Sequence, residues 1–207
     1  MRLSEKAYRL IKEKVITLEL PPSAVIDEQA LMQELDLGRT PIREALQRLD
    51  SEGLVNVVPR RGTFVSDISI TDLQTIFEFR TVLEGFCARL AAQRITDEQI
   101  EAMESVLRDL EEVRSGDRRA LMSLDQRFHS LLYAASDNEF LAATLDRLYD
   151  LSLRLWHLVL NHLEGVRHSI EQNARVIEAL REGNGVEAEA LMQEHIVEFQ
   201  QKIKAVL

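Results

Sequence analysis

The chain has 207 residues, of which 45% are hydrophobic and 29% are charged. These proportions allow a buried core, and the length allows two compact domains. No apolar run approaches the roughly 20 residues of a membrane-spanning helix, and the N-terminus lacks the apolar stretch of a signal peptide. The single cysteine, Cys87, excludes an internal disulfide framework. We therefore expect a cytoplasmic protein that has no membrane partner.

The net charge of −10 is distributed unevenly along the chain. Residues 1–66 contain ten Lys and Arg and ten Asp and Glu, so this segment is neutral. Residues 67–207 contain fifteen basic and twenty-five acidic residues and carry the whole net charge. A neutral segment can still bind nucleic acid if its arginines gather on one face. The acidic balance of the whole chain therefore does not exclude a DNA-binding N-terminal domain.

Two helices are predicted at the start of the chain. Apolar residues at helical spacing indicate a first helix over about residues 4–18, which Pro21 and Pro22 stop. Asp27 is a suitable N-cap for a second helix. Gly38 is expected to end that helix and to open a short turn.

A third helix and a hairpin are predicted to follow. Thr40 is a suitable N-cap, with Pro41 at the first helical position, and the helix runs to about Glu52. The runs 54–58 and 63–65 are rich in β-formers and flank a short turn. Three helices followed by a β-hairpin form the layout of a winged helix-turn-helix, whose third helix enters the major groove of DNA.

Arginines occur at both places where such a domain touches DNA. Arg39, Thr40 and Arg43 lie at the start of the third helix, and Arg60 and Arg61 lie at the hairpin tip. A guanidinium can bond in bidentate fashion to guanine or to phosphate. Solvated surface arginines are also common, and cations at a helix start oppose the helix dipole. The coincidence of the two clusters favours DNA contact.

The same segment resembles the DNA-binding domain of GntR-family regulators. The resemblance is carried by three runs, namely Gly38–Leu49, Glu52–Val55 and Arg60–Val65. It covers nearly all of residues 4–66. The residues that it implies as operator contacts are Arg39, Thr40, Arg43, Arg61 and Gly62. It further implies a homodimer that binds a palindromic operator.

The remainder of the chain is predicted to be helical throughout. The helices are expected near residues 71–93, 97–114, 117–135, 138–161, 167–182 and 186–205. Thr71–Gln74 and Thr96–Gln99 each fit a capping box. Short loops between long helices indicate an all-α antiparallel bundle. The fold class is therefore mainly α, with a DNA-binding domain over 1–66, a linker over 67–70 and a helical domain over 71–207.

Two ionisable residues of the third predicted bundle helix share one face. Asp125 and His129 are separated by four positions, and apolar residues surround them. Such a pair can bind a divalent metal. The alternative is a partly buried histidine that hydrogen-bonds to its neighbouring carboxylate.

The last two helices offer two further ligands. Asn173 lies ten residues before Gly183, and His195 lies ten residues after Gly185. If the glycines form a tight helical hairpin, both residues lie about 15 Å from the same loop, at 1.5 Å per residue. Asn173 and His195 are then at the same level on adjacent helices, which is how bundles build ligand and metal sites.

Residues 71–205 resemble the FCD effector domain of the FadR subfamily. The resemblance is carried by Ile76–Glu84, Asp125–His129 and Ala190–His195. In metal-binding members it implies one Asp and three His ligands, which correspond to Asp125, His129, position 173 and His195. Position 173 is Asn in this chain, and an amide oxygen is a harder and weaker donor than imidazole. Zinc, nickel and manganese are the candidate ions, and His157 or His168 is an alternative donor.

Arg80 lies on the first predicted bundle helix among apolar residues. The resemblance implies that this arginine faces the effector pocket, where a guanidinium suits a carboxylate ligand. The alternative is a surface ion pair with Glu84, four positions along the helix.

Three functions fit these observations. The first is a ligand-responsive transcriptional regulator, expected to be a repressor, that binds a small organic acid. The second is a metal-dependent hydrolase using the Asp/His site, which leaves the DNA-binding domain unexplained and lacks an evident general base. The third is a regulator whose helical domain only dimerises. We expect the first function and no enzymatic activity.

Overall fold

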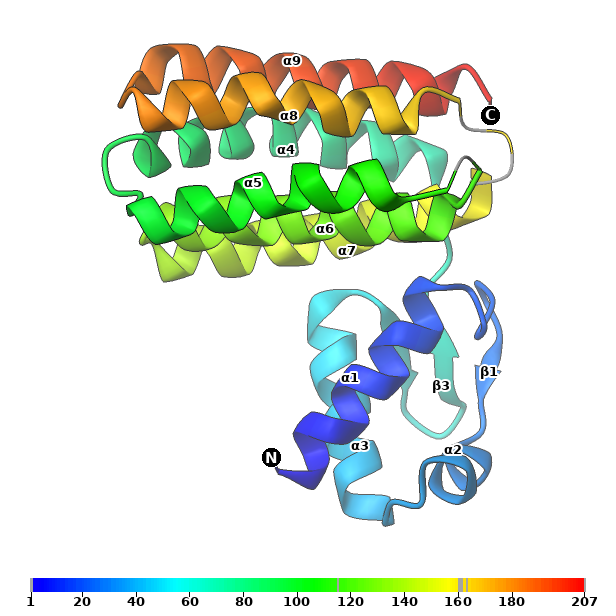
Figure 1. Cartoon of the computed structure of the whole chain (residues 1–207). Coiled ribbons are helices and arrows are strands. Elements are labelled where there is room, and N and C mark those ends of the chain that lie inside the picture. The colour runs from blue at the N-terminus through cyan, green and yellow to red at the C-terminus, as the bar shows by residue number, and fades with distance from the viewer. Residues whose placement is uncertain (1, 115, 160–161, 163, 207) are drawn as a thin grey trace. The chain divides into compact units, whose positions relative to one another are not determined.

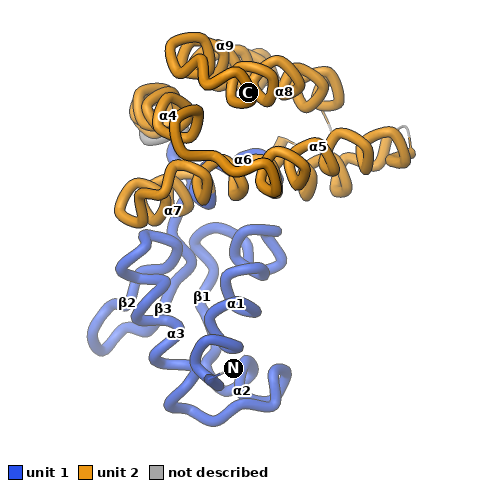
Figure 2. Tube along the Cα trace, turned by 60° about the vertical axis from the view of Figure 1, so that its left-hand side comes forward, with its two compact units in different colours: residues 1–73, 150–158 blue, residues 74–149, 159–207 orange. Residues whose placement is uncertain are grey.

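The computed structural model describes residues 2–114, 116–159, 162 and 164–206, without the side chains of residues 70, 72 and 73. It divides into two compact units (Figure 2). Unit 1 comprises residues 1–73 and 150–158, and unit 2 comprises residues 74–149 and 159–207. None of the helices in the described residues is both long and apolar enough to cross a membrane.

The N-terminal part of unit 1 contains the three predicted helices and the predicted hairpin, together with one additional strand. They are α1 (Leu3–Ile16), β1 (Val25–Ile26), α2 (Glu28–Leu35), α3 (Arg39–Glu52), β2 (Val55–Val58) and β3 (Gly62–Val65). The strands form one antiparallel sheet in the order β1-β3-β2 (Figure 2). The helices and the sheet share one apolar core, whose fully buried members include Ile11, Ile42 and Leu49. Burial of one such side chain stabilises the fold by about 1.5–3 kcal/mol.

The structure corrects two predicted helix ends in unit 1. The left-handed residue that ends α2 is Asp36, with a φ of 51°, and not Gly38. Gly38 is instead the N-cap of α3, so Thr40 and Pro41 lie within the first turn. The N–H groups of the first turn have no intrahelical acceptor, so a proline is accommodated at any of these positions.

Unit 1 also contains one strand that was not predicted and one helix cap that was. The strand β1 was not expected, because two residues are too few to show an alternating pattern. It pairs with β3 through Val25 and Phe64. The predicted cap at Asp27 is confirmed, since its side chain accepts hydrogen bonds from two backbone N–H groups of α2.

Helices make up the rest of the described chain. They are α4 (Ile70–Ala91), α5 (Asp97–Glu112), α6 (Arg118–Ala135), α7 (Glu139–Val159), α8 (Val166–Arg181) and α9 (Gly185–Lys204). α8 and α9 run side by side in opposite directions (Figure 1), and α5 packs against both α6 and α8. The predicted mainly-α class is confirmed.

The helix ends in unit 2 agree with the sequence patterns in part. The capping box at Thr96 is present, with reciprocal bonds to Gln99. The box predicted at Thr71 is wrong, because α4 already begins at Ile70 and Thr71 lies inside the helix. The predicted end of the helix 138–161 lies outside the described residues. Gly183, with a φ of 68°, closes the turn between α8 and α9.

The buried residues of unit 2 include an unusual number of polar side chains. Those that share the interior with the apolar core are Arg80, Glu84, Asp125, His129, Ser136, Ser169, Asn173 and His195. A buried charge is costly unless it is paired, and a buried amide is costly unless it is hydrogen-bonded. The interaction partners of these polar groups therefore indicate whether the interior of the bundle contains a functional site.

Candidate functional site

The start of α3 presents the predicted DNA-contacting side chains to solvent. Arg39, Thr40 and Arg43 are all exposed. The Nε atom of Arg43 lies 2.9 Å from an Oε atom of Glu28 on α2, although the arginine side chain remains 60% exposed. An exposed ion pair of this kind is weak, so the guanidinium remains available to a nucleic acid.

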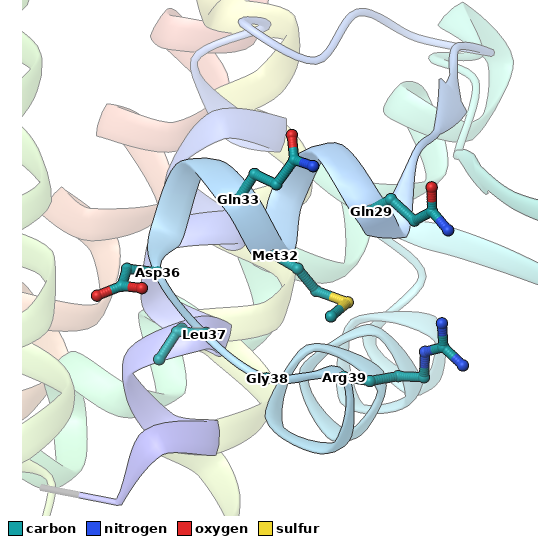
Figure 3. A pocket seen from close by; sticks show the side chains of 7 residues that line it. All are labelled: Gln29, Met32, Gln33, Asp36, Leu37, Gly38 and Arg39. Carbon is teal, nitrogen blue, oxygen red and sulfur yellow. The ribbon is translucent and has the colours of Figure 1, made fainter.

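A surface hollow adjoins the turn between α2 and α3. It has a volume of about 590 Å³ and is lined by Gln29, Met32, Gln33, Asp36, Leu37, Gly38 and Arg39. Gln29, Met32 and Arg39 extend toward the same side of the turn (Figure 3). Amide and guanidinium groups beside a helix N-terminus are suited to phosphate oxygens and base edges.

The tip of the β2–β3 hairpin presents the other predicted contacts. Arg60, Arg61 and Gly62 are exposed. The N–H of Arg61 donates to the carbonyl of Val58 at 3.1 Å, which closes the turn. Gly62 has a φ of 112°, in the region that favours glycine, so a side chain there would be strained.

Three of the four predicted metal-ligating residues lie together inside unit 2. Asp125 and His129 come from α6, and His195 comes from α9. One candidate ligand atom from each lies within 4.8 Å of the others, and all three side chains are buried. The Nε2 atom of His129 is 3.7 Å from an Oδ atom of Asp125, and the centres of the two imidazole rings are 5.4 Å apart.

The fourth predicted residue, Asn173, is fully buried on α8. Neither its amide oxygen nor its amide nitrogen has a hydrogen-bond partner, and the same holds for Nδ1 of His195. A buried polar group without a partner costs about 1–3 kcal/mol. Asn173 on α8 and His195 on α9 therefore offer atoms that are available to coordinate a ligand, on two helices that pack together.

His195 is held in the form that binds metals. Burial, followed by the proximity of His129, lowers the pKa of His195 from 6.5 to about 4. The ring is therefore neutral near pH 7, and a neutral imidazole has the free lone pair that a metal ion requires.

Tyr149 on α7 orients the carboxylate of the cluster. Its hydroxyl donates to an Oδ atom of Asp125 at 2.7 Å. Burial, together with the charge of Asp125, raises the pKa of Tyr149 well above its usual value, so the hydroxyl keeps its proton. The sequence gives no signal for this role of Tyr149, because its partner lies 24 positions away.

Arg80 and Glu84 form an ion pair in the interior of the bundle. The Nε atom of Arg80 lies 2.7 Å from Oε1 of Glu84, and the two side chains are 3% and 0% exposed. The alternative of a surface pair is therefore wrong, since the pair exists but is buried. Burial alone would raise the pKa of Glu84, but Arg80 and His129 outweigh it and lower the pKa to about 2.

Glu84 also contacts the cluster directly. Its Oε2 atom lies 2.7 Å from Nδ1 of His129. From the sequence, Glu84 is expected only as a partner of Arg80, since no local pattern reveals a contact with a residue 45 positions away. Of the two alternative donors, His168 is 67% exposed beside Glu171, and His157 lies in the segment 150–158 of unit 1.

Comparisons with known proteins show which families the two parts of the chain match. Residues 3–65 match the family described as "Bacterial regulatory proteins, gntR family", and residues 75–198 match the FCD domain. The HTH-type transcriptional repressor RspR of Escherichia coli K12 is 24% identical over 208 residues, which cover 99% of this chain and 90% of RspR. The Nta operon transcriptional regulator of Aminobacter aminovorans is 37% identical over 134 residues, covering 63% of this chain and 62% of that protein. The structure of E. coli McbR/YncC covers 99% of this chain and 98% of its own, with a TM-score of 0.88 and 21% identity.

Proposed function

The chain belongs to the GntR family of bacterial transcriptional regulators and carries an FCD domain, and we propose that it is a repressor that responds to a small organic acid bound through a divalent metal. Its family and its relatives are transcriptional regulators and not enzymes. GntR regulators bind operator DNA and effector ligands. The buried cluster of Asp125, His129 and His195 is the observation that carries the proposal.

The DNA-binding half of the proposal assigns residues 1–66 to operator recognition, with a linker at 67–70 and the effector domain over 71–207. Arg39, Thr40 and Arg43 would read base edges or phosphates. Arg60 and Arg61 would reach the backbone or minor groove from the hairpin. Their exposure, together with the positive φ of Gly62 at the start of β3, supports this assignment.

The residues of the buried cluster fit a divalent metal ion. Asp125 offers a carboxylate oxygen, His129 and His195 offer imidazole nitrogens, and Asn173 offers an amide oxygen that has no other partner. Zinc, nickel and manganese all accept such a mixed set, and the amide favours the harder ions among them. When bound, the ion supplies a positive charge to which a carboxylate can coordinate.

Arg80 is the proposed second contact of the acid. A guanidinium has five N–H donors, and the bond from Nε to Glu84 uses one of them. A carboxylate beside a guanidinium gains a charge-assisted hydrogen bond. The buried position of Arg80, over the ring of Tyr149 at 5.0 Å, supports a role inside the bundle rather than at its surface.

A homodimer would match a palindromic operator, because two-fold symmetry in the protein mirrors two-fold symmetry in the site. The exposed apolar side chains of Phe79 and Val82 on α4, which are 50% and 60% exposed, are consistent with an interface on that helix. Sedimentation of the wild-type protein and of Val82→Glu would test the assignment. The substitution should produce monomers if this face is the interface.

The proposal as a whole is tested by metal analysis and DNA binding on the same preparation. We expect purified protein to contain a stoichiometric divalent metal. We also expect a panel of organic acids to change its affinity for DNA upstream of its own gene, as measured by fluorescence anisotropy. Chelator-treated protein is the control and should lose the response to the acid. If no metal and no acid alters thermal stability or DNA affinity, the helical domain only dimerises.

A further inference from the structure

Four buried charged or polar groups of unit 2 form a chain of successive contacts. Nε of Arg80 is 2.7 Å from Oε1 of Glu84, and Oε2 of Glu84 is 2.7 Å from Nδ1 of His129. On the far side of the same ring, Nε2 of His129 is 3.7 Å from Asp125. Glu84 therefore uses one oxygen toward the arginine and the other toward the histidine.

The charge of Glu84 indicates where the ring proton lies. Oε2 of Glu84 has no aligned hydrogen-bond donor in the structure and lies 2.7 Å from Nδ1 of His129. Because an ionised carboxylate only accepts hydrogen bonds, its charge favours a hydrogen on that ring nitrogen. A neutral imidazole has a single N–H, so a proton on Nδ1 leaves Nε2 with a free lone pair. The separation of 3.7 Å between Nε2 and Asp125 is too long for a hydrogen bond, as expected if both atoms face a common third partner.

We propose that Glu84 is a positioning residue, which holds His129 in the Nδ1–H form and thereby presents Nε2 as a metal-ligand atom. The inference rests on the proposed metal site but assigns a residue that lies outside it. Carboxylate–histidine pairs behind a metal fix the tautomer and orientation of the ring and raise its basicity. Arg80 supports the arrangement because its guanidinium lies 2.7 Å from Oε1 of Glu84 and compensates the charge of that carboxylate in the interior.

A second neighbour of the His129 ring would favour the opposite tautomer if it donated a hydrogen bond. The hydroxyl of Tyr133 is 3.5 Å from the same Nδ1 atom. If Tyr133 donated to Nδ1, the proton would move to Nε2 and the ring would present N–H to the site, which excludes metal ligation through that atom. The shorter contact and the negative charge of Glu84 favour the Nδ1–H form.

The tautomer can be read directly in wild-type protein without metal. The chain has five histidines, so long-range nitrogen–proton correlation spectra of histidine-labelled, chelator-treated protein contain few signals. His129→Gln identifies the signal of His129 by its loss. We expect a protonated Nδ1 and an unprotonated Nε2, and the reverse pattern would overturn the inference. The measurement is made on metal-free protein, so the tautomer of His129 can be determined even if the proposal of a metal site is wrong.

The consequence for the metal is tested with Co²⁺, whose visible spectrum reports the ligand geometry. Glu84→Gln keeps the size of the side chain but removes the charge, and it should weaken Co²⁺ affinity by about 10- to 100-fold and alter the spectrum. Tyr133→Phe is the matched control and should change neither. Wild-type affinity and spectrum in Glu84→Gln would refute the role of Glu84. If Glu84→Gln does not fold, the tautomer of His129 in the wild-type protein decides by itself whether the proposed role of Glu84 holds.

Discussion

The depressed pKa of His195 makes a quantitative prediction about metal-free protein. The unfolded chain takes up a proton near pH 6.5, whereas the folded chain does so only at about pH 4, because burial and His129 oppose the charged ring. The free energy of unfolding therefore falls as the pH is lowered across this window, and above it His195 has no effect. At about 1.4 kcal/mol for each pH unit between the two values, the loss is about 3 kcal/mol.

Urea denaturation of chelator-treated protein, followed by far-UV circular dichroism at several pH values, measures this loss. Carboxylates also titrate near the lower end of the window, so the contribution of His195 is obtained by difference from His195→Gln. The variant should show a shallower dependence on pH. His168→Gln removes an exposed histidine and serves as the control, which should follow the wild type. An unchanged slope in His195→Gln would show that the ring is not protected from protonation in the folded state.

Three further results are expected. Asn173→His should raise zinc affinity at least about tenfold, or about 1.4 kcal/mol, in calorimetric titrations, and unchanged affinity would place position 173 outside the coordination sphere. Arg43→Ala should weaken operator binding by about 1–3 kcal/mol in anisotropy titrations, whereas Arg119→Ala, which removes an exposed charge from α6, should have little effect. Glu28→Gln releases Arg43 from its ion pair and should strengthen binding to non-specific DNA; equal affinity would mean that the pair does not compete with phosphate.

The sequence predicted the architecture because its periodicities are long. Helices of 14 to 22 residues show several turns of one apolar face, whereas β1 has only two residues and gave no signal. The ends were harder to predict. The Thr-Pro pair was compatible with more than one helix start, since none of the first N–H groups needs an intrahelical acceptor. The N-cap of α3 is Gly38, two residues before Thr40, and the helix begins at Arg39.

The candidate site was predictable only where its geometry follows from a single helix or a single turn. The spacing of Asp125 and His129 placed them on one face, and the tight turn at Gly183 related Asn173 to His195. The contact between Glu84 and His129 joins α4 to α6, and such a contact depends on how two distant helices pack. In the sequence, Glu84 is indistinguishable from an ordinary partner of Arg80 at the next turn.

The formal charges of the buried groups imply an order of binding at the proposed site. Arg80 compensates Glu84, so with neutral histidines the carboxylate of Asp125 leaves one negative charge in the interior. A carboxylate ligand entering metal-free protein would add a second charge of the same sign in a medium of low dielectric constant. A divalent ion reverses the sign, and the acid then neutralises the site. Metal and acid should therefore each tighten the binding of the other by the same factor, as linkage requires. Calorimetric titration of the acid into metal-free and metal-loaded protein tests this, and equal affinities would mean that the acid does not contact the ion.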